Sequence, residues 1–295
     1  MGTSKRTARS VTLGTWCIVA VMLAVSLVFL LPFVWTLATS FRTQADLAAN
    51  PLSLLPTHFS FVNYINIWQK IPFGRQLLNT ILYSGTVTIV SVFFDSMAGY
   101  AFARYKFPGK NFWFVAVLIT LMVPIQVTFI PLYTFLVQLG WINTFQGLII
   151  PRVADAFGIF FFRQFFLGVP KELEDAARID GAGEFRIYAR IMIPLAGPAV
   201  LTITLFNLIA NWNDLLWPLM VTTSSNMQTL PAGLAQFRGQ HVSDYGLLMA
   251  GSVLALVPMV VAFMIVQKRF IEGIATSGLN VQAQQRAENA PFDHT

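Results

Sequence analysis

Charged residues are scarce in this chain. Only 11% of its 295 residues are Asp, Glu, Lys or Arg, whereas 56% are hydrophobic. A soluble domain carries charge on about a quarter of its residues, so this chain cannot cover a soluble globule with charge. The composition therefore predicts an integral membrane protein of the all-α polytopic class, in which apolar runs of about 20 residues cross the bilayer as helices.

Cysteine and the common catalytic motifs are nearly or wholly missing. Cys17 is the single cysteine, so no intrachain disulfide forms. There is no Cys/His cluster with metal-ligand spacing, no H-E-x-x-H and no G-x-S-x-G. We therefore predict no catalytic residue and no metal site. The phosphate loop G-x-x-x-x-G-K-[ST] is also absent, so any transport work must draw on an ion gradient or on a partner.

Six apolar segments are long enough to cross a membrane. The fourth is the weakest because Arg152 and Asp155 interrupt it, and Pro124 and Pro131 predict a bend in the third. The predicted spans cover residues 13–38, 77–101, 112–136, 145–167, 195–221 and 247–266.

Basic residues set the orientation of these spans. Lys5, Arg6 and Arg9 precede the first run, which is too long for the apolar part of a signal peptide and has no clear cleavage site after it. With the N-terminus in the cytoplasm, 14 of the 19 lysines and arginines lie inside. The positive-inside rule therefore predicts that both termini are cytoplasmic and that the net charge of +6 reflects topology rather than nucleic-acid binding.

The domain organisation follows from these spans. Residues 1–12 form a predicted cytoplasmic N-terminus, residues 13–280 a transmembrane domain and residues 281–295 a predicted disordered cytoplasmic tail. Two long outer loops, about 39–76 and 222–246, are expected to fold or to bind something.

Polar residues form a stripe on each of two predicted spans. Thr80, Ser84, Thr88, Ser91 and Asp95 share one helical face in the second span. Such stripes can line a translocation path, but they also serve ordinary helix packing in lipid. We predict a polar substrate path, with its candidate residues being Ser84, Thr88, Asn207, Asn211 and Asp214.

Charges and tryptophans near membrane depth have two interpretations each. Arg152 and Asp155 stand three residues apart, so they either serve function or neutralise each other. Trp212 and Trp217 flank polar residues in NWNDLLWPL and suit either a sugar ring or the interfacial aromatic belt, which we favour.

One densely charged segment interrupts the apolar pattern on the cytoplasmic side. ELEDAARIDGAGEFRIYARIMIPL, residues 172–195, contains two short helix candidates divided by Gly181 and Gly183. Its alanines permit close approach of another surface and its acidic residues offer partners for Arg or Lys. The pattern fits a plug that docks into a partner, or an amphipathic helix that lies on the membrane.

The spacing of this segment resembles a known motif. Asp175-Ala-Ala-x-x-x-Gly181, nine residues, then Ile-x-Ile-Pro194 is similar to the E-A-A-x-x-x-G-x9-I-x-L-P loop of ABC importer permeases, with Asp175 in place of Glu and Ile193 in place of Leu. AGYAFARYKFPGK, FGIFFFRQFFLGVPKELEDAARIDGAGEF, NWNDLLWPL and TLPAGLAQF resemble the six-span permeases of maltose-type carbohydrate uptake systems. The resemblance runs from the first span to about residue 280.

This resemblance implies a set of partners. A second permease subunit would pair with this chain, most often as a heterodimer, in the cytoplasmic (inner) membrane. Two cytoplasmic ATPase subunits would bind ATP and Mg, which this chain does not, and an extracytoplasmic solute-binding protein would deliver the solute. The loop at about 168–194, between spans 4 and 5, would hold the coupling helix. Its expected interface consists of Glu174, Asp175, Ala176, Ala177, Asp180 and Gly181.

The predicted function is thus ATP-driven import of a sugar or sugar-like solute. An alternative is an ion-coupled secondary carrier or channel that uses Asp95 and Asp214. It differs in predicting concentrative uptake by this chain without an ATPase. A membrane-embedded enzyme is the third class, and no catalytic constellation supports it.

Overall fold

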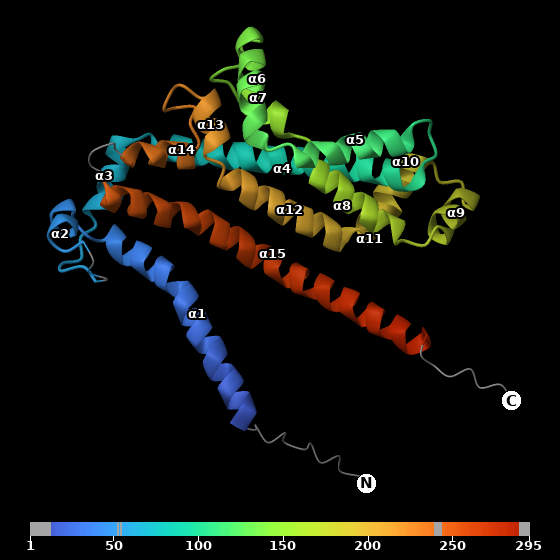
Figure 1. Ribbon diagram of the computed structural model, residues 1–295, viewed down its shortest axis with the longest axis horizontal. Helices are drawn as coiled ribbons and strands as arrows, with labels where there is room; N and C mark the ends of the chain where they lie inside the picture. Colours follow the sequence, from blue (N-terminus) through green and yellow to red (C-terminus); the bar gives the residue numbers. More distant parts are fainter. Residues whose placement is uncertain (1–12, 52, 54, 239–243, 289–295) are drawn as a thin grey trace. The chain divides into compact units, whose positions relative to one another are not determined.

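The computed structural model describes residues 13–51, 53, 55–238 and 244–288, and every regular element in these ranges is a helix. The chain divides into two compact units, Met1–Lys70 with Phe237–Leu254, and Ile71–Gln236 with Ala255–Thr295. Figure 1 labels the helices of both units. The all-α prediction is confirmed for the part of the chain that the structure describes.

The first unit contains the first span and the loop that follows it. Its helices are α1 (Leu13–Ser40), α2 (Gln44–Ala49), α3 (Val62–Lys70) and the start of α15 (Tyr245–Glu288). Apolar side chains are exposed along α1, as expected of a helix whose solvent is lipid. Arg42 follows α1 and is fully buried, and Asn63 of α3 donates to the backbone oxygens of Ser40 and Arg42 at 2.9 and 2.8 Å.

The second unit is built around α4 (Phe73–Arg104), with α8 (Ala156–Leu167) and α12 (Gly197–Trp212) beside it (Figure 1). Gly99 of α4 permits the close approach of α8, since a Cβ there would lie 2.6 Å from Cβ of Phe162. The elements after α4 are α5 (Lys110–Met122), α6 (Ile125–Gln138), α7 (Phe145–Ile149), η1 (Ile150–Arg152), α8 (Ala156–Leu167), α9 (Glu172–Ile179), α10 (Glu184–Ile187), η2 (Tyr188–Met192), α11 (Ile193–Leu195), α12 (Gly197–Trp212), α13 (Leu216–Val221), α14 (Leu230–Leu234) and η3 (Ala235–Phe237).

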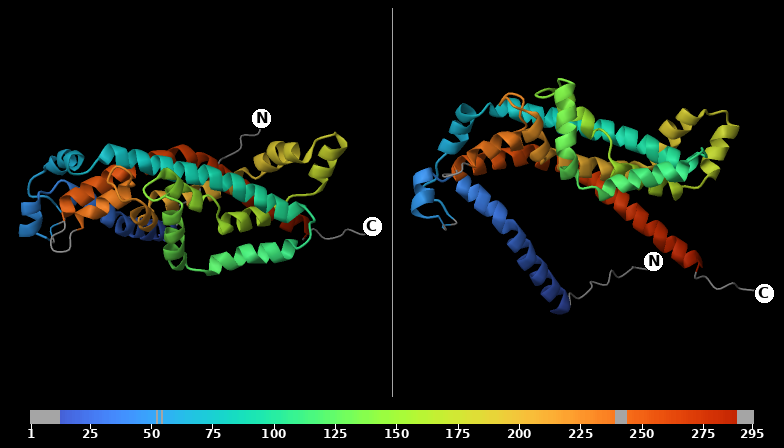
Figure 2. Two further views of the ribbon diagram at one scale, coloured as in Figure 1. Left: turned by 90° about the horizontal axis from the view of Figure 1, so that it is seen from above. Right: turned by 45° about the horizontal axis from the view of Figure 1, so that its top comes forward.

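The predicted spans appear as four single candidates and two bent pairs. The single candidates are Gly14–Ser40, Phe73–Arg104, Phe145–Leu167 and Tyr245–Ile265. The α5 and α6 helices are bent by 101° relative to each other, and Glu184–Leu195 is bent by 78° relative to Gly197–Trp212. The sharp bend between α5 and α6 is visible in Figure 2. Counting each bent pair as one span gives the six that the sequence predicts.

Proline explains the bend in the third span only in part. The break falls at Val123 and Pro124, where Pro124 holds an extended ψ of 128° and α6 begins after it. Pro131 lies inside α6 without ending it. Of the two prolines that predict a bend, Pro124 therefore marks its position.

The structure differs from the predicted disordered tail. Helix α15 continues to Glu288, beyond the expected end of order at residue 280. Residues 281–288 read VQAQQRAE, and Ala, Gln, Arg and Glu all have high helix propensity. The rest of the predicted tail, 289–295, and the predicted N-terminus, 1–12, lie outside the described residues.

Candidate functional site

The charged segment between α8 and α12 folds as two short helices joined by a tight turn. Helix α9 ends at Ile179 with Asp180 as its C-cap, and Gly181 follows in the left-handed conformation with φ 79°. The Gly181 N–H donates to the oxygen of Arg178 and the Ala182 N–H to that of Ala177. These two bonds form a Schellman cap, which glycine favours because it has no Cβ. Gly183 has φ −72°, a backbone conformation that any residue can adopt.

Glu174 lies inside the subunit rather than on the docking face that the sequence predicts. Its side chain is 3% exposed, and its Oε1 lies 2.5 Å from Nε of Arg104 at the end of α4. Tyr100 donates its hydroxyl to Oε2 at 3.1 Å. Arg104 also donates to the backbone oxygen of Val169 at 2.5 Å. Glu174 therefore attaches α9 to α4, and its charge is used within the chain.

Asp175 has the opposite environment. Its side chain is 66% exposed and pairs with Nη1 of Arg178 at 2.8 Å. Arg178 also donates from Nε to Oε1 of Glu184 at 2.8 Å and from Nη2 to Oε2 at 3.2 Å. The hydrogen bonds with Glu184 raise the pKa of the Arg178 guanidinium. Arg178 thus closes α9 against α10, while Asp175 keeps a face toward solvent.

The remaining interface candidates divide between the surface and the interior. Ala176, Asp180 and Gly181 are exposed, whereas Ala177 is buried. Two apolar residues that the sequence reasoning did not select are also exposed, Ile179 at 87% and Phe185 at 67%. Large apolar side chains exposed beside small and acidic ones are typical of a surface that a partner covers.

The polar stripe of α4 is buried inside the second unit. Ser84 donates to the oxygen of Thr80 at 2.7 Å, and both Ser84 and Thr88 are at most 3% exposed. Ser91 donates to Oδ2 of Asp95 at 2.6 Å and accepts from Asn207 of α12 at 3.3 Å. In this conformation the stripe packs α4 against α8 and α12, which is the packing interpretation of the pattern.

Asp95 ties α4 to the start of α8. Its Oδ1 accepts the backbone N–H of Asp155 at 3.0 Å, and Gly158 leaves the space that its carboxylate occupies. Asp155 itself accepts from the N–H of Phe157 at 3.2 Å and caps α8. Asp155 is therefore a helix cap, and it forms no ion pair with Arg152, which was one of the two interpretations of these charges.

Arg152 pairs instead with Asp214, at the break between α12 and α13. Nη2 of Arg152 lies 3.6 Å from Oδ2 of Asp214, which also accepts the hydroxyl of Tyr83 at 2.9 Å. Tyr83 also contacts Oδ1 of Asn211 at 3.3 Å. The Asp214 side chain is 14% exposed and that of Arg152 is 23% exposed. Three of the predicted path residues thus lie on or just after α12: Asn207 and Asn211 within it, and Asp214 two residues beyond its end. Asp214 is partly exposed and contacts both Arg152 and Tyr83.

The two tryptophans of NWNDLLWPL differ from the favoured expectation of an interfacial belt. Trp212 is 7% exposed and Trp217 is 1% exposed. The indole N–H of Trp217 donates to the backbone oxygen of Leu148 at 3.0 Å. Both rings pack within the protein, so neither faces lipid headgroups nor presents a surface to a sugar.

Fold and site together define a class of protein. Apolar spans and a charged helical hairpin with an exposed face describe a polytopic membrane protein with a surface that a partner can cover. The chain belongs to the family of binding-protein-dependent transport system inner membrane components, whose family model matches residues 95–275. It is therefore a permease subunit of an ABC importer.

Relatives with described roles match nearly the whole chain. The arabinooligosaccharides transport system permease protein AraQ of Halalkalibacterium halodurans is 36% identical over 268 residues, which are 90% of this chain and 96% of that protein. The diacetylchitobiose uptake system permease protein NgcG of Streptomyces coelicolor is 32% identical over 263 residues, covering 88% and 86%. The sn-glycerol-3-phosphate permease UgpE of Shigella flexneri is 31% identical and covers 87% and 94%.

A solved structure shares the fold. A chain of a bacterial ABC transporter involved in the import of the acidic polysaccharide alginate superposes with a TM-score of 0.76 at 24% identity, over 92% of this chain and 100% of that chain. Family and fold thus support the ABC importer over the ion-coupled carrier.

Proposed function

We propose that this chain is the permease subunit of an ATP-driven importer of an oligosaccharide or another sugar-like solute. The relatives named above carry arabinooligosaccharides, diacetylchitobiose and sn-glycerol-3-phosphate, all polyhydroxylated solutes. We further propose a second permease subunit, two cytoplasmic ATPase subunits that use ATP and Mg, and an extracytoplasmic solute-binding protein. Both termini lie in the cytoplasm.

The face of the 172–184 hairpin carries this proposal. Asp175, Ala176 and Asp180 are exposed together with Ile179, on a helix whose other side is fixed to α4 through Glu174. Asp175 is then the acidic residue that meets a basic residue of the ATPase, and Glu174 is the residue that positions the helix. A packed small-residue contact moves as a rigid body, because packed interfaces switch rather than stretch.

The substrate path is proposed at the α12–α13 break. Asp214, Arg152 and Asn211 offer carboxylate, guanidinium and amide groups, which hydrogen-bond sugar hydroxyls. Two of these three side chains are partly open. The buried stripe of α4, including Ser84 and Thr88, reaches solute only if α4 separates from α8 and α12 during transport.

Gly181→Ala in the reconstituted transporter tests the docking role. A Cβ at φ 79° is strained by roughly 1–3 kcal/mol, so the hairpin turn opens and the ATPase contact shifts. We expect solute uptake and solute-stimulated ATP hydrolysis to fall at least tenfold while the subunits still reach the membrane.

The matched control is Gly183→Ala, where φ is −72° and no atom lies within 4 Å of the added Cβ. This variant should transport like the parent. Normal uptake by Gly181→Ala, or equal losses in both variants, would contradict the role assigned to the turn.

A further inference from the structure

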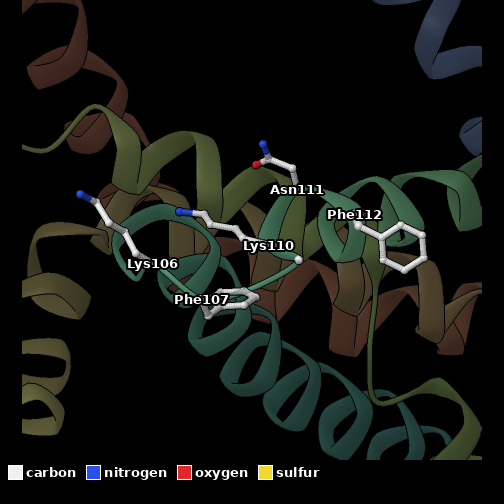
Figure 3. Close-up of a pocket in the computed structure, with 6 residues that line it drawn as sticks. Lys106, Phe107, Lys110, Asn111 and Phe112 are labelled. Atoms are coloured by element: carbon white, nitrogen blue, oxygen red, sulfur yellow. The ribbon is translucent and has the colours of Figure 1, made fainter.

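The turn between α4 and α5 borders a shallow, open pocket of about 390 Å³. It is lined by Lys106, Phe107, Gly109, Lys110, Asn111 and Phe112. Figure 3 shows the ammonium groups of Lys106 and Lys110 extending to the same side, with the Phe112 ring at the opposite end. Lys110 is held in place, since its Nζ donates to the backbone oxygen of Tyr105 at 2.9 Å.

The pocket carries positive charge that no carboxylate balances. In the part of the chain that the structure describes, neither Lys106 nor Lys110 has a carboxylate within 4 Å. Arg104, by contrast, is neutralised by Glu174. An anion in the pocket would therefore meet a preformed positive field.

The flank of the pocket is apolar and leads along a membrane span. Phe112 is 69% exposed and Trp113 is 57% exposed, directly after Lys110 and Asn111. Val115 and Ile119 continue the exposed apolar surface of α5. A ligand that fits both surfaces has an anionic head and an apolar tail, which excludes a simple phosphate ion as the best occupant.

We propose that this pocket binds the headgroup of an anionic phospholipid, with the acyl chains lying along Phe112 and Trp113. The phosphate contacts Lys106 and Lys110, and the amide of Asn111 hydrogen-bonds the headgroup. Basic pockets at the cytoplasmic ends of spans suit such headgroups. That the pocket faces the cytoplasm rests on the membrane orientation proposed above. The match between its lysines and an anionic headgroup does not depend on that orientation.

Quenching of Trp113 by brominated lipid tests the proposal. The complete transporter is placed in nanodiscs of unlabelled phosphatidylcholine. One sample also contains phosphatidylglycerol with brominated acyl chains, and the other contains the same amount of phosphatidylcholine with brominated acyl chains. We expect stronger quenching by the phosphatidylglycerol, and we expect Trp113→Phe to remove the excess. Neutralising one lysine should weaken the apparent affinity about fivefold, and Lys106→Gln with Lys110→Gln roughly 25-fold, since each surface cation contributes about 1 kcal/mol.

The matched control is Lys70→Gln with Arg75→Gln, which removes equal charge from exposed residues outside the pocket. Its excess quenching should equal that of the parent. Equal quenching by both lipids would overturn the proposal. Loss of the excess quenching in millimolar inorganic phosphate would overturn it in favour of a free-anion site. An excess found only after the ATPase subunits are removed would overturn it in favour of a protein contact. None of these depends on whether the transporter carries a sugar.

Discussion

Two neighbouring carboxylates in α9 have different roles because of what surrounds each one. Glu174 is buried against Arg104, whereas Asp175 is open to solvent. Glu174→Gln leaves the guanidinium of Arg104 buried without its charge partner. Breaking such a pair costs roughly 3 kcal/mol or more, so we expect a lower melting temperature of the detergent-solubilised complex.

Glu172→Gln is the control for that measurement, since Glu172 is exposed in the same helix and should change stability by less than about 0.5 kcal/mol. Equal melting temperatures for the Glu174 and Glu172 variants would show that the buried pair contributes nothing to the fold.

Asp46 gives the loop after α1 a defined pH response. Its Oδ2 accepts Nε of Arg42 at 2.7 Å and its Oδ1 accepts the hydroxyl of Thr57 at 2.7 Å. The bond from Arg42 holds the pKa of Asp46 below its usual range. A lowered pKa stabilises the loop above the usual value of about 3.9, and this stabilisation is lost as the pH falls below it.

Hydrogen exchange of residues 43–51, corrected for the intrinsic rate, measures this response. Protection should be constant from pH 7 to about pH 5 and should fall below about pH 4. Asp46→Asn should lower protection at neutral pH and remove the step. A step that persists in Asp46→Asn would assign the titration to another group.

At the scale of elements, α4 and α8 pack closely because of a glycine. A Cβ at Gly99 would lie 2.6 Å from Cβ of Phe162 and 2.9 Å from the backbone nitrogen of Arg163. Neither atom can move without the helix, so Gly99→Ala should destabilise the protein by about 1–3 kcal/mol. Thermal unfolding in detergent is the measurement.

Gly85→Ala provides the comparison within the same helix, because nothing lies within 4 Å of a Cβ there. Replacing a helical glycine by alanine stabilises a helix by up to about 1 kcal/mol. The two substitutions should therefore shift the melting temperature in opposite directions, and a stabilising Gly99→Ala would contradict the close packing of α4 and α8.

The elements that sequence reasoning predicted well are those set by local rules. Apolar runs fix the spans, Pro124 ends a helix and Gly181 makes a cap, and each effect acts within a few residues. Helix propensity is also local, yet the polarity of residues 281–288 suggested disorder where α15 continues. Polarity excludes a buried segment, but it does not exclude a helix.

The candidate site was harder to predict because its contacts join residues far apart in the chain. Nothing local distinguishes Glu174 from Asp175 as the buried carboxylate, and Arg104 is its partner only in the folded unit. In the same way, Arg152 stands near Asp155 in sequence but pairs with Asp214. One local signal for the exposed face was present in the sequence: Ile179 is a large apolar residue between two charged residues at the end of a predicted helix.

For the whole molecule, the proposed orientation can be tested by cysteine labelling. Cys17→Ala removes the native thiol, after which Asn226→Cys and Glu172→Cys each introduce one exposed thiol. A membrane-impermeant maleimide should label residue 226 in right-side-out vesicles and residue 172 only in inverted ones. Labelling in the reverse pattern would place the termini outside, and labelling of both sites in sealed right-side-out vesicles would contradict the span count.

Helix α4 contacts the loop after α13 near its start and the 172–184 hairpin at its end. Near its start, Asn79 donates to the backbone oxygens of Asn226 and Gln228 at 2.8 and 2.9 Å, and at its end Arg104 holds Glu174. A continuous helix of 32 residues spans about 48 Å. If a ligand outside and nucleotide inside both bias the position of this one rod, each must change the affinity for the other by the same factor. The strength of the coupling could therefore be measured from either side of the membrane.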